Sequence, residues 1–285
     1  MKYWTRIIGV GLMTVTLATA AHAAVGLQTI REFTLPVKPL DVALSPDGRL
    51  TFVLADNGTI LVYAVDSGLK DTITVGPGID RIAVADEGHT LVLTNSKTKQ
   101  VRQVAVAFQA MIDIADSPFK GKKDAPIVLA VFSDFQCPHC GRIAPVLEQV
   151  LEHNPETVKI VFKNFPLNMH KLAMPAAQAA MAAHNQGKFW EFHNQIFATP
   201  NLAPDSFTKI ATGLGLDMAR FEADMKAPAT QNKIMADMRN ASAAEVNGTP
   251  SIFVNGWLYR GQRTPEAMQQ VVDQEVTKLA ATKKK

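Results

Sequence analysis

Residues 127–140 read Ile-Val-Leu-Ala-Val-Phe-Ser-Asp-Phe-Gln-Cys-Pro-His-Cys. The run from Ile127 to Phe132 is almost continuously apolar and has the length of a buried strand. Beyond Pro138, a residue tolerated in a first helical turn, apolar side chains recur at helical spacing. They are Ile143, Val146, Leu147, Val150 and Leu151. The segment therefore predicts a strand, a short connection and a helix, with Cys137 and Cys140 at the start of the helix.

The rest of the C-terminal half extends this pattern. Residues 158–165 predict a second strand, which completes a βαβ unit. Several helices are expected over about 171–245, followed by a hairpin through Asn255-Gly256 and a last amphipathic helix. We therefore expect one α/β domain over residues 124–285 that contains an inserted helical subdomain.

The two cysteines, three positions apart in 285 residues, are the only ones in the chain. Structural disulfides stabilise most when they close long loops, so this spacing indicates chemistry rather than a structural cross-link. A c-type haem site needs histidine directly after the second cysteine, where Gly141 stands, and a structural zinc site needs four ligands. We therefore expect no metal and no cofactor, but a redox-active disulfide between Cys137 and Cys140.

The position of this pair predicts the role of each cysteine. A sulfur at a helix N-terminus faces unpaired backbone N–H groups and the positive end of the helix dipole, which stabilise the thiolate. Cys137 is therefore the expected nucleophile, and Cys140 is expected to resolve the mixed disulfide. Between them, Pro138 suits the first helical turn, and His139 adds a group that favours the anion.

Four segments, in their order along residues 120–280, resemble the bacterial DsbA-like thiol-disulfide oxidoreductases. They are Ser133 to Cys140, Lys163 to Leu167, Gln186 to His193, and Gly248 to Gly256. The resemblance implies a thioredoxin-like fold, exported protein substrates with cysteines, and a membrane redox partner that resets the dithiol. It also implies that Pro250 is a cis-proline opposite the disulfide, and that Thr249 and Pro250 present backbone groups to an extended substrate peptide.

Other polar and aromatic residues receive structural interpretations. Asp134 and Lys163 are candidates for a proton-relaying acid and base, but we interpret them as a strand-end acid and a solvated lysine. Three histidines, not spaced at i, i+4, are interpreted as helix-surface residues: His170, His184 and His193. The aromatic residues of the insertion are expected to fill its core, namely Phe189, Trp190, Phe192 and Phe197.

Residues 24–112 predict a small all-β domain with two blade-like repeats. Residues 42–54 and 82–94 match at a period of 40, and each has a strand, a turn with Asp and Gly, and a second strand. The first turn, Ser-Pro-Asp-Gly-Arg, resembles the YVTN and WD40-like β-propeller repeats. Because propellers close with about four to eight blades, the stretch is either an open sheet packed on its neighbour or a half-module completed by another copy of the chain. Residues 113–123, rich in charge, Pro and Gly, predict a linker.

The first 23 residues have the pattern of a secretory signal peptide. Lys2 and Arg6 precede an apolar stretch that ends in Ala21-His22-Ala23, a small-x-small cleavage pattern. We therefore expect cleavage near Ala23 and a protein that is periplasmic or otherwise exported. Removal of residues 1–23 leaves a formal charge of +1 in place of +3, and so small a charge argues against nucleic acid as a partner.

Three functions follow, and we favour the first. A disulfide-forming oxidase is favoured by the Pro-His dipeptide, which DsbA itself carries, because a stabilised thiolate makes the disulfide a strong oxidant. A dimeric isomerase or reductase kept in the dithiol state is the alternative, since Thr249 resembles the isomerase branch and the N-terminal domain is a possible site of homodimerisation. A Cu(I)-binding partner protein is disfavoured, because no Met-rich or His-rich run accompanies the cysteines.

Overall fold

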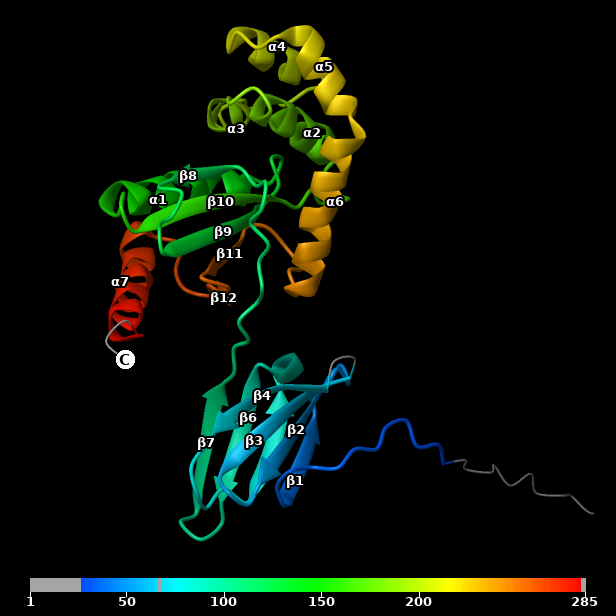
Figure 1. Cartoon of the computed structure of the whole chain (residues 1–285), viewed down its shortest axis with the longest axis vertical. Coiled ribbons are helices and arrows are strands. Elements are labelled where there is room, and N and C mark those ends of the chain that lie inside the picture. The colour runs from blue at the N-terminus through cyan, green and yellow to red at the C-terminus, as the bar shows by residue number, and fades with distance from the viewer. Residues whose placement is uncertain (1–26, 66–67, 283–285) are drawn as a thin grey trace, which may run out of the picture. The chain divides into compact units, whose positions relative to one another are not determined.

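The computed structural model describes residues 27–65 and 68–282 (Figure 1). The predicted signal peptide lies outside these described residues. The chain divides into two compact units, Met1–Val104 and Ala105–Lys285. Within the described ranges, no helix is long and apolar enough to cross a lipid bilayer.

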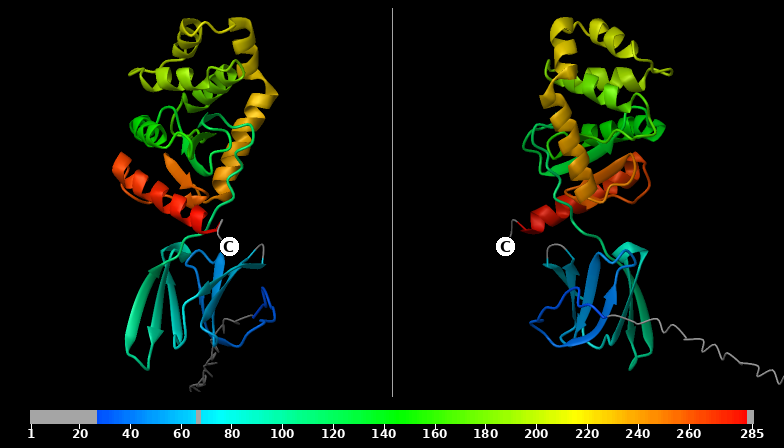
Figure 2. Two further views of the ribbon diagram at one scale, coloured as in Figure 1. Left: turned by 60° about the vertical axis from the view of Figure 1, so that its left-hand side comes forward. Right: turned by 90° about the vertical axis from the view of Figure 1, so that its right-hand side faces the viewer.

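The N-terminal unit consists of two antiparallel sheets (Figures 1 and 2). The strands of the first sheet follow in sequence order: β1 (Pro39–Leu44), β2 (Leu50–Ala55), β3 (Thr59–Ala64) and β4 (Gly68–Thr74). Those of the second are β5 (Arg81–Ala85), β6 (Thr90–Asn95) and β7 (Gln100–Ala105), with the 3-10 helix η1 (Asp86–Gly88) between β5 and β6. The sequence repeat corresponds to a structural repeat, because β1–β2 and β5–β6 are each the first antiparallel pair of their sheet. Two sheets do not close a ring, and the propeller interpretation stays a prediction.

Asp41 in β1 joins the two sheets. Its Oδ2 accepts a hydrogen bond from the backbone N of Ile82 in β5 at 3.0 Å, and Arg81 Nη1 lies 3.9 Å from its Oδ1. The turn between β1 and β2 needs a glycine, since Gly48 has a φ of +71°. Side chains in β2 and β3 are mostly buried on both faces, whereas β1 exposes Leu40, Val42 and Leu44.

The C-terminal unit is organised around a five-stranded sheet. Its strands follow in the order β12 (Trp257–Leu258), β11 (Ser251–Val254), β9 (Ile127–Ser133), β10 (Val158–Asn164) and β8 (Phe119–Gly121). The central pair β9 and β10 is parallel, and the other pairs are antiparallel. Helices α1 (Pro138–His153) and α7 (Pro265–Thr282) pack on one face (Figures 1 and 2).

Alternation along β9 builds a core on each side of this sheet, because successive strand side chains point to opposite faces. Ile127, Leu129 and Val131 pack against α1 and α7 in one cluster. Ala130 and Phe132 belong to a second cluster on the other face, together with the end of helix α6. β9 is therefore buried on both faces, as its apolar run predicted.

Five helices form the inserted subdomain, within the expected stretch 171–245. They are α2 (Ala173–His184), α3 (Phe189–Phe197), α4 (Ser206–Gly213), α5 (Met218–Lys226) and α6 (Pro228–Ala243). The alanines of α2 are all buried, so neighbouring helices can approach its backbone closely. α6 runs from the top of the subdomain back to the sheet (Figure 1), where Ala241 contacts the sheet core.

The predicted linker 113–123 is wrong, because this segment is part of the C-terminal unit. β8 lies within it and pairs with β10, and Phe162 N donates to Pro118 O at 2.9 Å. The unit begins even earlier, since Ala110 N donates to Gly256 O at 2.8 Å. Charge and glycine are as typical of an exposed edge strand as of a linker, so composition alone could not separate the two.

Candidate active site

Cys137 is the residue immediately before α1. Its backbone is extended, with φ −77° and ψ 117°, and Pro138 occupies the first helical turn. The carbonyl of Cys137 accepts hydrogen bonds from Cys140 N at 3.0 Å and Gly141 N at 3.3 Å. The sulfur thus stands at the N-terminal end of the helix, where the first backbone N–H groups have no partners within the helix. This is the position that the sequence predicted.

Pro138 and His139 lie exposed on the first turn of α1. Nη2 of Arg142, one turn later, donates a hydrogen bond to His139 Nδ1 at 2.8 Å. The guanidinium, which stays protonated, brings a positive charge to the turn that carries the cysteines.

The loop before β11 faces Cys137 across 112 residues of sequence. Its Thr249–Pro250 peptide bond is cis, which confirms the conformation implied by the resemblance. The Cys137 thiol lies 3.5 Å from the carbonyl oxygen of Thr249. β11 neighbours β9 in the sheet, and β9 leads directly to Cys137, so sheet pairing brings the two segments together. Arg263 Nη2 donates to Pro250 O at 3.0 Å and holds this loop in place.

Cys140 is the more deeply buried of two unpaired thiols, with 1% of its surface exposed against 6% for Cys137. Burial raises the pKa of the Cys140 thiol to about 12, although hydrogen bonds from the Asp134 backbone and from Ser133 and Thr249 act in the opposite direction. Cys140 is therefore almost entirely a neutral thiol at pH 7. Cys137 is thus the more exposed of the two sulfurs, and Cys140 lies deeper.

Asp134 holds the connection between β9 and α1. Its Oδ1 accepts from Gln136 N at 2.7 Å; its Oδ2 accepts from Leu167 N at 2.8 Å and from His170 Nδ1 at 2.7 Å. The prediction that His170 lies on a helix surface is wrong, because it lies in the loop before α2 and folds back onto Asp134. Helical spacing carries no information on this contact, which joins residues 36 positions apart.

Lys163 is buried rather than solvated, contrary to prediction. It is 1% exposed, and its Nζ lies 2.5 Å from Oδ1 of Asp237 in α6. The same carboxylate oxygen lies 2.9 Å from Lys233 Nζ, and its partner oxygen accepts from Asn164 N and Nδ2 at 3.0 and 2.8 Å. Burial lowers the pKa of Lys163, and the nearby Asp237 opposes this effect. This ion cluster ties β10 to α6.

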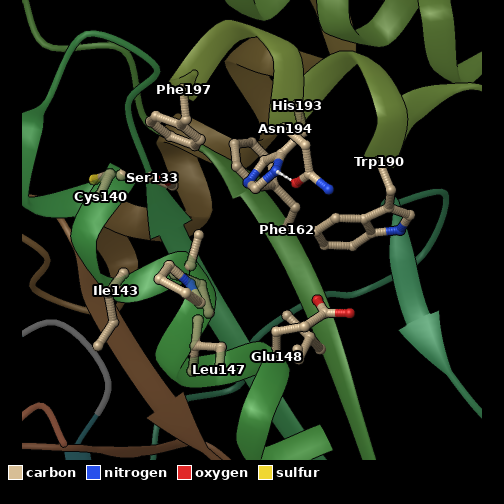
Figure 3. A pocket seen from close by; sticks show the side chains of 15 residues that line it. Ser133, Cys140, Ile143, Leu147, Glu148, Phe162, Trp190, His193, Asn194 and Phe197 are labelled. Carbon is tan, nitrogen blue, oxygen red and sulfur yellow. Dashed lines mark hydrogen bonds between the residues drawn. The ribbon is translucent and has the colours of Figure 1, made fainter. Parts of the chain in front are cut away.

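His193, predicted to lie on a helix surface, is 6% exposed and is packed among aromatic rings. The ring centroids lie 4.8–5.8 Å from those of Phe197, Trp190, Phe162 and Phe135. Burial lowers the pKa of His193 to about 4. The ring borders a cavity of about 370 Å³, which Cys140 also lines (Figure 3). Phe189 and Phe192 are buried in the core of the subdomain as predicted. Trp190 and Phe197 pack against the same core and also line this cavity.

The depressed pKa of His193 predicts an acid-sensitive fold. Unfolded histidine has a pKa of about 6.5, so between pH 6.5 and 4 the unfolded chain binds this proton more tightly than the folded chain does. Above pH 6.5 this linkage does not lower the free energy of unfolding. At pH 4.5 it lowers the free energy of unfolding by about 2–3 kcal/mol. Urea denaturation of wild type and His193→Phe at pH 7 and 4.5 checks this, with exposed His153→Gln as control. An equal loss in wild type and His193→Phe would show that His193 is not the group responsible.

A dithiol at the start of a helix, after the central strand of a mixed sheet and opposite a cis-proline loop, defines a class of redox proteins. The thioredoxin family profile matches residues 114–274, and the chain belongs to this family. The chain also resembles a solved thioredoxin-like oxidoreductase from Silicibacter pomeroyi, with 29% identity and a TM-score of 0.53 over 57% of this chain and 94% of that one. The C-terminal unit thus has the fold and the cysteine pair of this family.

Other similar proteins extend this comparison. The thiol-disulfide exchange protein alpha-DsbA2 of Wolbachia pipientis shares the fold, with 22% identity and a TM-score of 0.52 over 56% of this chain and 89% of that one. A protein named Na(+)/H(+) antiporter NhaA 3, from Salinispora tropica, is 34% identical over 155 residues, which are 54% of this chain and 24% of that protein. The chain spans about a quarter of the length of such curated relatives.

Proposed function

We propose that this protein is an exported oxidase that passes its Cys137–Cys140 disulfide to substrate proteins. The observation that carries this proposal is the position of Cys137, at the start of α1 and 3.5 Å from the carbonyl of Thr249. An extended peptide that pairs with the Thr249–Pro250 loop brings its own cysteine beside Cys137. The Pro138-His139 dipeptide and the signal-peptide pattern support the oxidising role and the export.

The reaction transfers two electrons from substrate to protein. A substrate thiolate attacks Cys137 Sγ, the Cys137–Cys140 bond breaks, and the leaving Cys140 sulfur takes up a proton, as its pKa of about 12 favours. A second substrate thiolate then attacks the substrate sulfur of the mixed disulfide and releases Cys137. The substrate leaves with a new disulfide, and a membrane redox partner must remove two electrons to restore the oxidised protein.

The positive charge on the first turn of α1 supports the same direction. Arg142, bonded to His139, adds its charge to the positive end of the helix dipole on this turn. A stabilised thiolate stabilises the reduced protein, which makes the disulfide a stronger oxidant.

A dimeric isomerase or reductase is the second candidate, and one observation favours it. Strand β1 exposes three apolar side chains, Leu40, Val42 and Leu44, and contiguous exposed apolar surface often marks a protein–protein contact. Pairing of two N-terminal units would cover them and place two Cys137 centres on one particle.

The reduction potential of the dithiol tests the proposed direction. An oxidase is expected to equilibrate with glutathione at a potential near that of DsbA, about −120 mV, whereas a value near the −270 mV of thioredoxin contradicts the proposal. The oxidised protein should also form disulfides in a reduced, unfolded substrate without rearranging a scrambled one. Sedimentation of the same sample separates the candidates further, because a dimer that refolds scrambled substrate supports the isomerase.

A further inference from the structure

A cavity of about 370 Å³ lies between α1 and α3, on the inner side of Cys140 (Figure 3). Neither thiol-disulfide exchange nor the Thr249–Pro250 loop uses this space. Its volume falls within the range of about 300–1,000 Å³ found for small-molecule sites. Its walls are mainly apolar, with Ala144 and Leu147 on α1 opposite Trp190 and Phe197 on α3.

One nitrogen on the cavity wall can accept a hydrogen bond from a molecule in the cavity. Nδ1 of His193 lies 2.8 Å from Asn194 Oδ1; because an amide oxygen only accepts, Nδ1 carries the proton and Nε2 is a bare acceptor. Over residues 27–65 and 68–282, Nε2 makes no hydrogen bond with another residue. Because Nε2 has no partner among the described residues, a donor inside the cavity can bind to it.

The surroundings of this acceptor restrict what can bind. Burial keeps His193 uncharged by lowering its pKa to about 4, and the same surroundings disfavour a charged ligand. The carboxylate of Glu148, also on the wall, forms an ion pair with Lys120 and further disfavours an anion. Trp190 Nε1 already donates to Phe119 O at 2.8 Å, so this residue offers the cavity only the apolar surface of its ring.

We propose that this cavity binds a small, neutral aromatic molecule that donates one hydrogen bond, of which phenol is the simplest example. Its ring packs against Phe162, Trp190 and Phe197, and its hydroxyl donates to His193 Nε2. A ring in this position covers the cavity side of Cys140 and leaves Cys137 open. The binding does not depend on whether the protein acts as oxidase or isomerase.

Three probes of similar size test the proposal: phenol, toluene and benzoate. Each is titrated at pH 7 into the purified protein, and binding is followed by NMR at the indole N–H of Trp190, with the exposed Trp257 as reference. One neutral hydrogen bond changes affinity about threefold to tenfold. We therefore expect phenol to bind about threefold to tenfold more tightly than toluene, and benzoate to bind more weakly than both. In His193→Phe the preference for phenol over toluene should disappear.

A second pair of variants distinguishes the cavity from non-specific adsorption. Ala144→Phe fills the cavity from α1 and should remove the binding of phenol and toluene alike. Gln149→Phe adds the same ring to the exposed side of α1 and should leave binding unchanged. Equal affinity of wild type for phenol and toluene overturns the proposal, as does a phenol-induced shift at Trp257 without one at Trp190. The probe titrations on wild type decide the matter even if a variant does not fold.

Discussion

Replacing Cys137 with serine is expected to abolish thiol-disulfide exchange, whereas Cys140→Ser is expected to trap a mixed disulfide with substrate. The loss of turnover in Cys137→Ser should be on the order of 1,000-fold or more, because the sulfur that forms the covalent intermediate is gone. Cys140→Ser keeps that sulfur but lacks the group that breaks the intermediate. Non-reducing electrophoresis with a cysteine-containing substrate shows the trapped complex directly.

The same two variants measure the reactivity of each thiol separately. With a pKa of about 12, Cys140 has roughly 3,000-fold less thiolate at neutral pH than a free cysteine of pKa about 8.5. A thiolate of higher pKa is, however, a stronger nucleophile. With a Brønsted slope of about 0.4–0.5, this property raises the rate of the Cys140 thiolate about 40-fold. In Cys137→Ser, which also removes the raising effect of Cys137 on this pKa, Cys140 should therefore react with a small disulfide reagent up to about 100-fold more slowly than free cysteine does.

The pH dependence gives a second test of this assignment. Because the raised pKa of Cys140 lies far above neutrality, its rate should climb about tenfold per pH unit from pH 6 to 9. Cys137 in the Cys140→Ser variant should react faster than Cys140 throughout this range. If Cys140 reacts first, the assignment is wrong, and Cys140 is the nucleophile.

Asp237→Asn is expected to lower the free energy of unfolding of the C-terminal unit by about 3–5 kcal/mol, as for other broken buried ion pairs. The substitution keeps the shape of the side chain but removes the charge that faces both Lys163 and Lys233. Lys163 is 1% exposed and cannot turn toward water to recover its hydration. Urea denaturation followed by tryptophan fluorescence measures the change.

A surface ion pair and a double variant serve as controls. Lys188 and Glu191 form a 3.0 Å pair, but both side chains are more than 40% exposed, so Glu191→Gln should cost at most about 1 kcal/mol. In a Lys163→Met background, Asp237→Asn should cost less than it does in wild type, because one stranded cation is gone. Equal costs in both backgrounds would rule out the ion cluster as the cause.

Local patterns in the sequence were sufficient for the dithiol and its setting. The apolar run of β9, the proline after Cys137 and the helical spacing up to Leu151 are properties of neighbouring residues, so strand, cysteine pair and helix could be predicted together. The cis conformation of Thr249–Pro250 came from resemblance rather than from physical reasoning. The strands of the N-terminal unit followed from an internal repeat, but a repeat does not specify how many copies are needed to close a ring.

Only the tertiary structure decided what the polar residues do. Lys163 and Asp237 are 74 positions apart in the sequence. His170 contacts Asp134, although a helix and a strand lie between them in the sequence. Such contacts depend on which faces of β10, α6 and the active-site loop meet, and a lysine in a strand looks the same in sequence whether it faces water or a buried carboxylate. The cavity beside Cys140 could not be predicted for the same reason. It arises where α1 and α3 pack without filling the space between them. The sequence by itself determined which residue carries the redox chemistry, and the packing of distant elements decided its surroundings.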